Sequence, residues 1–316
     1  IFKLVESADV IIDNFRPGTL ERLGLEYDVL KKHNPKIIQM SITGYGETGP
    51  YSKRRVYDPL IQATAGVSDA QSLEGQPKYM KTLMCDKVTS LTAAQAMTAA
   101  LYKREKTNEG QRITLSMLDT ALYFMWCDSM YNYTWYGDDW APMPNIADFY
   151  EPVKTKDGHI ALVAINDSEF EGVLKAIGKE DLLEDERFST TENRLMNVME
   201  MQEILLNAYS EFTSEELVKR MEENDVPAAK INTREEVLTD PQVLNNNSII
   251  NTNKNGKEIL RGPKPPANFT GTDCDEPTFS PALGQHSSEI LKEYGYSDEE
   301  INSLIDNEIV QGGKIG

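Results

Sequence analysis

Two short apolar runs, each followed by polar and glycine-rich residues, constrain the fold of this chain most strongly. The first, "DVIID", leads into "NFRPG", and the second, "IIQMSIT", leads into "GYGETGP". The segment between them, "TLERLGLEYDVLKKHNPK", has apolar residues at helical spacing, so the three together predict a βαβ unit of an open parallel sheet. Ligands of such sheets bind beyond the carboxyl ends of the strands. We therefore expect a site near residues 13–18 and 43–50.

The later segments extend this unit into an α/β fold with a second, smaller domain. "CDKVTSLTAAQAMTAALYKREK" predicts a long helix with a stop at Gly110, "ITLSM" predicts another strand, and residues 118–137 predict a long aromatic-rich helix or connector. From "YEPVKTKDGHIALVAIND" onward the pattern predicts a hairpin followed by short charged helices. We expect a large domain over 1–143, a small α+β domain over 144–241, and a linker with C-terminal helices that return to the large domain over 242–316.

Composition excludes several classes of partner. The 316 residues carry a formal net charge of -19, which argues against nucleic acid or an anionic membrane surface, because both require a basic footprint. No apolar run approaches the roughly 18 residues of a membrane span, and no segment resembles a signal peptide. The three cysteines are odd in number and widely separated, which fits a reducing compartment, so we expect a cytoplasmic protein. Neither the cysteines nor the three histidines have metal-site spacing.

Asp86 stands at the start of the apolar, alanine-rich helix, and two roles suit this place. A carboxylate before a helix can accept hydrogen bonds from the first free N–H groups, and the helix dipole favours its charge. The same geometry suits a nucleophile that forms covalent acyl intermediates. Cys85 is another candidate nucleophile, because a thiol at a helix start can have a lowered pKa. A buried structural cysteine is the ordinary alternative.

Basic residues are scarce in this acidic chain, so their grouping is informative. "SKRRVYD" places Lys53, Arg54 and Arg55 together, and "NFRPGTLERLG" places Arg16 and Arg22 near a predicted strand end. Such groups can hold a phosphorylated ligand. A solvated run of charges is the alternative, and the pattern alone does not separate the two.

Four long segments carry a family resemblance in their order along the chain. They are "ADVIIDNFRPGTLERLGL", "YDPLIQATAG", "ALYKREKTNEGQRITLSMLDTAL" and "LGQHSSEILKEYGYSDEEI". These segments resemble the class III CoA-transferases, the formyl-CoA and carnitine-CoA transferase type. The resemblance implies that Asp86 is the catalytic nucleophile. It also implies that the CoA contacts are made by Asn14, Phe15, Arg16, Arg22, Arg55, Val56, Tyr57 and Asp58.

The resemblance further implies an activity and an assembly. We expect transfer of coenzyme A from an acyl-CoA thioester to a free carboxylic acid, through aspartyl anhydride and aspartyl-CoA thioester intermediates, without a metal or a tightly bound cofactor. The fold implied is a Rossmann-like parallel sheet in the large domain, with two subunits interlocked as a homodimer. The family normally begins with a further strand and helix, whereas this chain opens at Ile1 inside what reads as a helix. We therefore expect that N-terminal part to be missing here.

Two other functions remain open at this stage. The α-methylacyl-CoA racemase branch of the same fold needs a base on each face of the α-carbon and pairs a histidine with the family aspartate. This chain has Tyr57 at the position of that histidine and Asp167 near the position of a helper glutamate. A non-catalytic acyl-CoA-binding protein is the third possibility.

Overall fold

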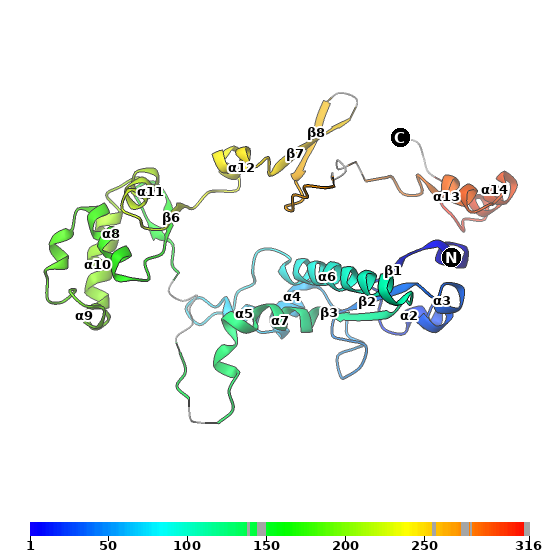
Figure 1. Ribbon diagram of the computed structural model, residues 1–316, viewed down its shortest axis with the longest axis horizontal. Helices are drawn as coiled ribbons and strands as arrows, with labels where there is room; N and C mark the ends of the chain where they lie inside the picture. Colours follow the sequence, from blue (N-terminus) through cyan, green and yellow to red (C-terminus); the bar gives the residue numbers. More distant parts are fainter. Residues whose placement is uncertain (138–139, 144–149, 255–256, 273–277, 279, 313–316) are drawn as a thin grey trace. The chain divides into compact units, whose positions relative to one another are not determined.

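The computed structural model describes residues 1–316 apart from 138–139, 144–149, 255–256, 273–277, 279 and 313–316 (Figure 1). The chain divides into two compact units, Ile1–Asn145 together with Ala282–Gly316, and Ile146–Pro281. The expected start of the small domain at residue 144 lies outside the described residues. Residues 242–281 of the expected linker belong to the second unit. Among the helices that the structure describes, none has the length and apolar character that a membrane span requires.

The first unit is built on a three-stranded parallel sheet. Its strands are β1 Val10–Asp13, β2 Ile38–Thr43 and β3 Arg112–Ser116. They lie in the order β1-β2-β3, with Val10 opposite Ile38 and Met40 opposite Ile113 (Figure 1). Ile38 and Met40 are fully buried, which explains the apolar run in the sequence. The mixed α/β class and the parallel sheet are thus confirmed.

Helices and a short 3-10 helix complete the first unit. They are α1 Phe2–Ser7, α2 Thr19–Arg22, α3 Tyr27–His33, α4 Asp58–Thr64, α5 Val67–Ala70, α6 Met84–Thr107, α7 Met117–Ser129, η1 Tyr131–Tyr133, α13 Ser287–Glu293 and α14 Asp298–Asp306. The helix expected between β1 and β2 is two helices, because Gly24 lies between α2 and α3 with a φ of 68°. The expected aromatic helix is shorter than predicted, since α7 ends at Ser129 and η1 follows.

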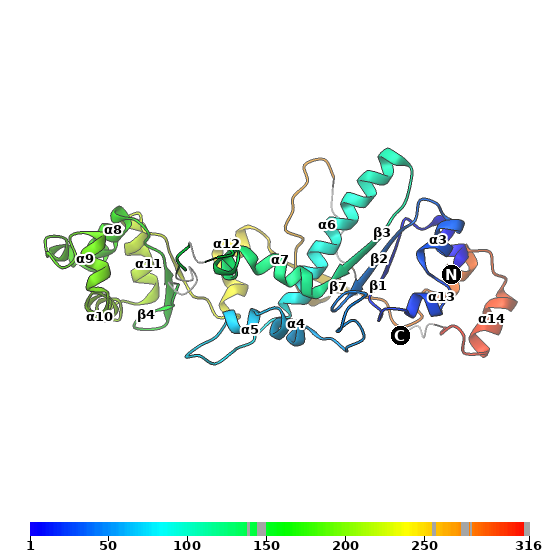
Figure 2. The same cartoon turned by 90° about the horizontal axis from the view of Figure 1, so that it is seen from below.

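The long helix α6 packs against β2, β3 and α7 (Figure 2). Its end differs from the prediction, because Asn108 rather than Gly110 takes the left-handed conformation at the stop, with a φ of 60°. Asparagine tolerates that conformation better than most residues. Gly110 serves a different purpose. A Cβ atom there would lie 2.0 Å from the carbonyl oxygen of Ile37, so glycine lets the chain approach β2 closely before β3 begins.

The second unit contains a small antiparallel sheet and a separate hairpin. The sheet, in the order β4-β5-β6, consists of β4 Val153–Lys154, β5 His159–Leu162 and β6 Ala228–Lys230. The hairpin consists of β7 Ile249–Lys254 and β8 Lys257–Pro263. The helical elements are α8 Asp167–Ile177, η3 Glu180–Leu183, α9 Thr191–Met196, α10 Val198–Tyr209, α11 Ser214–Glu223, η4 Glu236–Thr239 and α12 Pro241–Asn245. The antiparallel pairing of β4 with β5 confirms the predicted hairpin.

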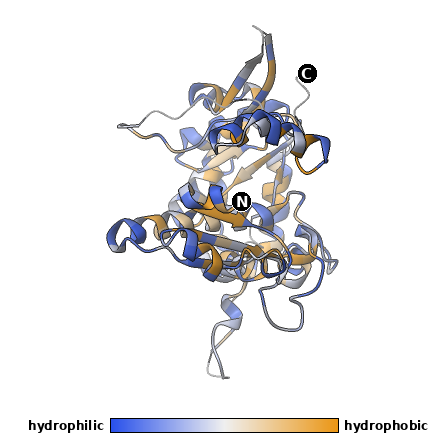
Figure 3. Cartoon of the chain, turned by 90° about the vertical axis from the view of Figure 1, so that its right-hand side faces the viewer, coloured by the Kyte–Doolittle hydropathy of each residue, from blue (hydrophilic) through white to orange (hydrophobic). Residues whose placement is uncertain are grey.

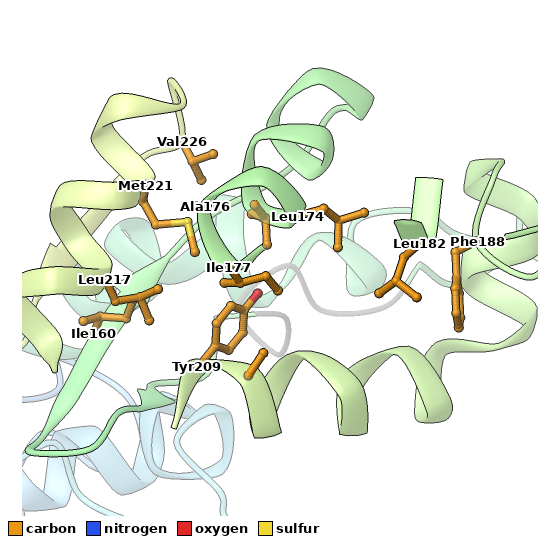
Figure 4. Packing of buried hydrophobic residues seen from close by; sticks show 12 residues of the cluster. Ile160, Leu174, Ala176, Ile177, Leu182, Phe188, Tyr209, Leu217, Met221 and Val226 are labelled. Carbon is orange, nitrogen blue, oxygen red and sulfur yellow. The ribbon is translucent and has the colours of Figure 1, made fainter. Parts of the chain in front are cut away.

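This second unit has its own hydrophobic core. Buried residues of β5, α8, α10 and α11 form one cluster, in which Ile177 of α8 is directed toward Tyr209 of α10 (Figure 4). Ile160, Leu174 and Leu217 are fully buried in it. In Figure 3 the helices carry hydrophilic and hydrophobic residues interleaved along their length, as one-sided burial requires.

Candidate active site

The loop after β1 borders a pocket of about 230 Å³ at the carboxyl end of that strand. Phe15 and Arg16 line the pocket, and the backbone N–H of Phe15 donates a hydrogen bond to Oδ1 of Asp13 at 3.2 Å. At the end of α2, Nη2 of Arg22 donates to Oγ1 of Thr19 at 2.9 Å, and Thr19 also lines the pocket. Of the predicted site residues, Phe15 and Arg16 line this pocket, Asn14 directly precedes them in the chain, and Arg22 contacts the lining residue Thr19.

The floor of this pocket is polar. Oγ of Ser41 donates to Oδ2 of Asp13 at 2.6 Å, and the N–H of Gly46 donates to Oγ1 of Thr43 at 3.1 Å. Gln39 is only 2% exposed, and in the described part of the chain its Oε1 atom has no hydrogen-bond partner. A buried acceptor without a partner costs free energy. Gln39, Ser41 and Thr43 thus give this part of the pocket a polar lining.

Charges of both signs line the pocket. Arg16 and Arg112 contribute cations, and Arg112 forms an ion pair with Glu47. The lining carboxylates are Asp13, Glu21, Glu26, Asp28 and Glu47. The pocket is therefore lined by more carboxylates than arginines, in contrast to the basic cluster expected from the sequence. A phosphate group bound here would have to be met mainly by Arg16, with Arg22 close by on α2.

A second group of predicted site residues lies against the end of β2. Gly44 directly follows β2, and a Cβ atom on it would lie 2.4 Å from Cγ1 of Val56. Arg55 is exposed, and Tyr57 is 74% exposed. The guanidinium carbon of Arg54 lies 3.6 Å from the centre of the Tyr51 ring, so a cation–π contact engages this arginine.

The contact between Gly44 and Val56 predicts a sensitive position. We expect Gly44→Ala to lower the free energy of unfolding by about 1–3 kcal/mol, because the added methyl group overlaps the side chain of Val56. The measurement is the urea midpoint of unfolding. Val56→Gly removes the three atoms that the new methyl group would touch, so Gly44→Ala should cost far less in that background. An equal cost in both backgrounds would show that Val56 is not the cause.

Asp86 lies inside the first turn of α6. It is the third residue of the helix and is half-buried, while Leu83 takes the N-cap position without a side-chain capping hydrogen bond. The expected capping role of Asp86 is therefore wrong, because its backbone already belongs to the helix. The helix dipole nevertheless favours negative charge at this place.

A carboxylate from another helix binds the backbone of Asp86 instead. Oδ2 of Asp58, the first residue of α4, accepts a hydrogen bond from the N–H of Asp86 at 3.0 Å. Its other oxygen, Oδ1, accepts from Nε2 of Gln62 at 2.5 Å. Asp58 is 2% exposed and Gln62 is 1% exposed. The structure thus brings Asp58 and Asp86 together and buries the side chain of Asp58.

Cys85 is a poor nucleophile in this setting. Its side chain is fully buried, and this burial, with the nearby charges of Asp58 and Asp86, raises the pKa of the thiol to about 11. The nucleophilic alternative for Cys85 is therefore not supported, and the ordinary alternative of a buried cysteine is confirmed. The neighbouring carboxylates and the loss of water outweigh the effect of the helix start. At neutral pH the thiol stays protonated, and only a thiolate attacks efficiently.

Thiol labelling tests this conclusion. At pH 8, well below a pKa of about 11, we expect iodoacetamide to modify the exposed Cys127 while Cys85 stays unmodified in the folded protein. Peptide mass spectrometry after a labelling time course measures both sites. Labelling of both sites in urea provides the control. Rapid modification of Cys85 in the folded protein would contradict the raised pKa.

Sequence reasoning missed Gln62, although it organises this site. Oε1 of Gln62 accepts from the N–H of Met80 at 2.9 Å, and Nε2 approaches the carbonyl of Thr82 at 3.3 Å. Gln62 therefore binds the segment that leads into α6. The available signal was a polar pair, Asp58 and Gln62, spaced four residues apart on the apolar face of a helix.

The other residues considered from the sequence, Asp167 and His33, make contacts away from Asp86. Asp167 lies in the second unit, where Arg194 donates a hydrogen bond to it and holds the pKa of its carboxyl below the usual range. His33 stacks on Phe2 with ring centres 4.3 Å apart. Across the described residues, no group of three histidine, cysteine, aspartate or glutamate side chains is placed to hold a metal ion.

Known proteins of similar sequence and structure agree on one family. Residues 1–287 match CoA-transferase family III. The succinate–glutarate CoA-transferase of Agrobacterium fabrum is 32% identical over 296 residues, which cover 92% of this chain and 74% of that protein. The (R)-2-hydroxy-4-methylpentanoate CoA-transferase of Clostridioides difficile is 31% identical over 319 residues, which cover 98% of this chain and 79% of that protein.

A solved structure supports the same assignment. The crystal structure of a CAIB/BAIF family protein from Brucella suis superposes with a TM-score of 0.80 at 31% sequence identity, covering 93% of this chain and 77% of that one. The match in fold and the match in sequence extend over nearly the same share of the chain. The protein therefore belongs to CoA-transferase family III and is an enzyme of that class.

Proposed function

We propose that this enzyme moves coenzyme A from an acyl-CoA thioester to a free carboxylic acid, with Asp86 as the covalent nucleophile. One observation carries the proposal: a half-buried carboxylate stands in the first turn of α6 with its backbone held by Asp58. The adjacent thiol of Cys85 is protonated at neutral pH and does not compete. Buried apolar residues near this turn include Met84, Ile61 and Ala121, which favours exclusion of water.

The first half of the proposed reaction transfers CoA to the enzyme. A carboxylate oxygen of Asp86 attacks the thioester carbonyl, the carbon–sulfur bond breaks, and a mixed anhydride and a CoA thiolate result. The thiolate then attacks the aspartyl carbonyl of the anhydride. The donor acid leaves as its carboxylate, and an aspartyl-CoA thioester remains.

The second half reverses these steps with another acid. The acceptor carboxylate attacks the aspartyl-CoA thioester, which releases the CoA thiolate and forms a second anhydride. The thiolate attacks the acceptor's carbonyl, giving the new acyl-CoA and restoring Asp86. The positive end of the α6 helix dipole is suited to stabilise the oxyanions. Atoms and charge balance without a metal or a tightly bound cofactor.

The proposed CoA site uses the residues at the carboxyl ends of β1 and β2. In the first group, Arg16 borders the pocket beside Phe15, and Arg22 lies on the adjacent α2. In the second group, Arg55 and Tyr57 are exposed next to the start of α4. Guanidinium groups suit the phosphates of CoA because they form charge-assisted, bidentate hydrogen bonds.

We further propose a cytoplasmic homodimer. Large aromatic side chains on α7 and just after it are exposed in the single chain, including Tyr123 at 84% and Trp135 at 70%. Exposed apolar surface of this kind commonly marks a subunit interface. Cys127 is free and exposed, which suits a reducing compartment.

One assay tests the proposed function. The protein is incubated with succinyl-CoA and a panel of free acids that includes glutarate and 2-hydroxy-4-methylpentanoate, because relatives carry these acids in their names. We expect a new acyl-CoA to form in step with loss of the donor. Denatured protein is the control. A failure of every donor and acceptor pair, together with retained CoA binding, would support a binding protein instead.

The racemase alternative is tested by a second assay, which measures deuterium exchange. A racemase would exchange deuterium from solvent at the α-carbon of a 2-methylacyl-CoA without moving CoA. Tyr57 at the expected histidine position disfavours this chemistry, since the racemases use a histidine there and imidazole is the side chain that exchanges a proton readily near neutral pH. Exchange without transfer would contradict the proposed function.

A further inference from the structure

A buried polar network connects α4 to the start of α6. Gln62 on α4 binds the N–H of Met80 at 2.9 Å, and Asp58 on α4 binds the N–H of Asp86 at 3.0 Å. The 2.5 Å hydrogen bond from Gln62 to Asp58 links the two contacts. One helix thus holds both the approach to α6 and its first turn.

The carboxylate of Asp58 provides a hydrogen-bond acceptor for the start of α6, which the residues next to that helix start do not provide. A helix begins with four N–H groups that have no partner within the helix, and α6 has no side-chain cap at Leu83. Asp58 satisfies the N–H of Asp86 from 28 residues away. Charge-assisted hydrogen bonds of this kind are roughly twice as strong as neutral ones. Since a helical side chain follows its backbone, this bond constrains the Asp86 carboxyl group as well.

The burial of Asp58 separates it from the ligand-binding residues near it. Both of its oxygens are engaged, with Gln62 and with the backbone of Asp86, and its side chain is almost fully buried. Tyr57, the preceding residue, is exposed by contrast. The two neighbours therefore point to different functions, although the family resemblance groups both with the CoA contacts.

We infer that Asp58 is a positioning residue, which sets the orientation of the nucleophile Asp86 through its backbone N–H and does not bind CoA. This inference rests on the proposed function, because it assigns Asp58 a part in the covalent step. Gln62 orients Asp58 in turn. The network acts as a fixed support, so its loss lowers the rate of attack and leaves the affinity for acyl-CoA unchanged.

The test variant is Asp58→Asn. An amide has one acceptor and one donor, so either Gln62 or the N–H of Asp86 loses its acceptor, while the shape stays the same. We expect kcat to fall by about 100-fold, the loss that a small misplacement of reacting groups causes. KM for acyl-CoA should stay within about twofold, and trapping of the aspartyl-CoA thioester should slow in parallel with kcat.

The rescue variant is Asp58→Asn with Gln62→Glu. The new glutamate provides two acceptors, one for the amide of the new asparagine and one for the N–H of Met80, so the asparagine oxygen can again face Asp86. We expect this pair to regain part of the lost kcat, since the glutamate cannot donate to the carbonyl of Thr82 as Gln62 does. Asp69→Asn, an exposed carboxylate on α5 of the same unit, is the control for loss of charge and should leave kcat unchanged.

Amide hydrogen exchange provides a readout that does not depend on activity. In Asp58→Asn the peptide that contains residues 83–90 should exchange faster, while the second half of α6 keeps its rate. Failure of the wild-type protein to transfer CoA would refute the proposed function but leave this local exchange result intact. A raised KM with unchanged kcat would instead make Asp58 a CoA contact. Unchanged kcat together with unchanged hydrogen exchange would show that Asp58 neither positions Asp86 nor binds CoA. Either this result or a raised KM with unchanged kcat would overturn the inference.

Discussion

Asp86→Asn should abolish CoA transfer almost completely while the protein remains folded. The amide keeps the shape of the side chain but removes the nucleophilic oxygen, so we expect a loss of at least about a thousandfold in kcat. Asp86 makes no capping contact, and losing its interaction with the helix dipole should cost no more than about 1 kcal/mol. Binding of acyl-CoA should persist. Mass spectrometry should find a CoA-sized adduct on Asp86 in the parent protein and none in the variant.

A matched control exists on the next helix. Asp119 is the third residue of α7, as Asp86 is of α6, so Asp119→Asn makes the same chemical change at the same helical position. We expect it to retain transfer. A rate near that of the parent in Asp86→Asn would disprove the aspartyl mechanism. An equal loss in both variants would point to a general effect of helix charge.

Arg55→Glu should raise KM for the acyl-CoA by about tenfold to a hundredfold, the range that a lost charge-assisted hydrogen bond predicts. The exposed Arg55 lies between Arg54 and Val56 at the end of β2, where the phosphates of CoA are proposed to bind. A reversed charge there repels the nucleotide. KM for the free acid should change far less, because the acid lacks the nucleotide. Steady-state kinetics with each substrate varied in turn separates the two effects.

The neighbouring arginine is the control for net charge. Arg54→Glu changes the charge equally, but the guanidinium of Arg54 is engaged by the ring of Tyr51. We expect a smaller rise in KM from this variant. Equal effects of both variants would indicate long-range attraction rather than a contact, and such attraction would weaken steeply with added salt. Equal effects of Arg55→Glu on the donor and on the acceptor would contradict the proposed CoA site.

The strands of the parallel sheet were readable from the sequence because each has a simple local cause. In β2 the apolar residues Ile38, Met40 and Ile42 alternate with Gln39, Ser41 and Thr43, and this period of two is typical of a strand. Helix limits were less predictable. Gly24 divides the expected helix, and Asn108 rather than a glycine ends α6, because a left-handed φ depends on backbone geometry that the apolar period does not record.

The sequence by itself determined the family, the α/β class and the identity of Asp86 as the candidate nucleophile, since motifs in order along a chain are local patterns. Only the tertiary structure decided what holds that residue. Asp58 and Gln62 are one helical turn apart, but their partners Met80 and Asp86 come from a different segment and meet them through packing. The raised pKa of Cys85 has the same origin, because burial and neighbouring charge are set by contacts across the fold. Residue patterns identify secondary-structure elements and candidate side chains. The role of each side chain depends on its distances, burial and hydrogen bonds to segments that are remote in the sequence.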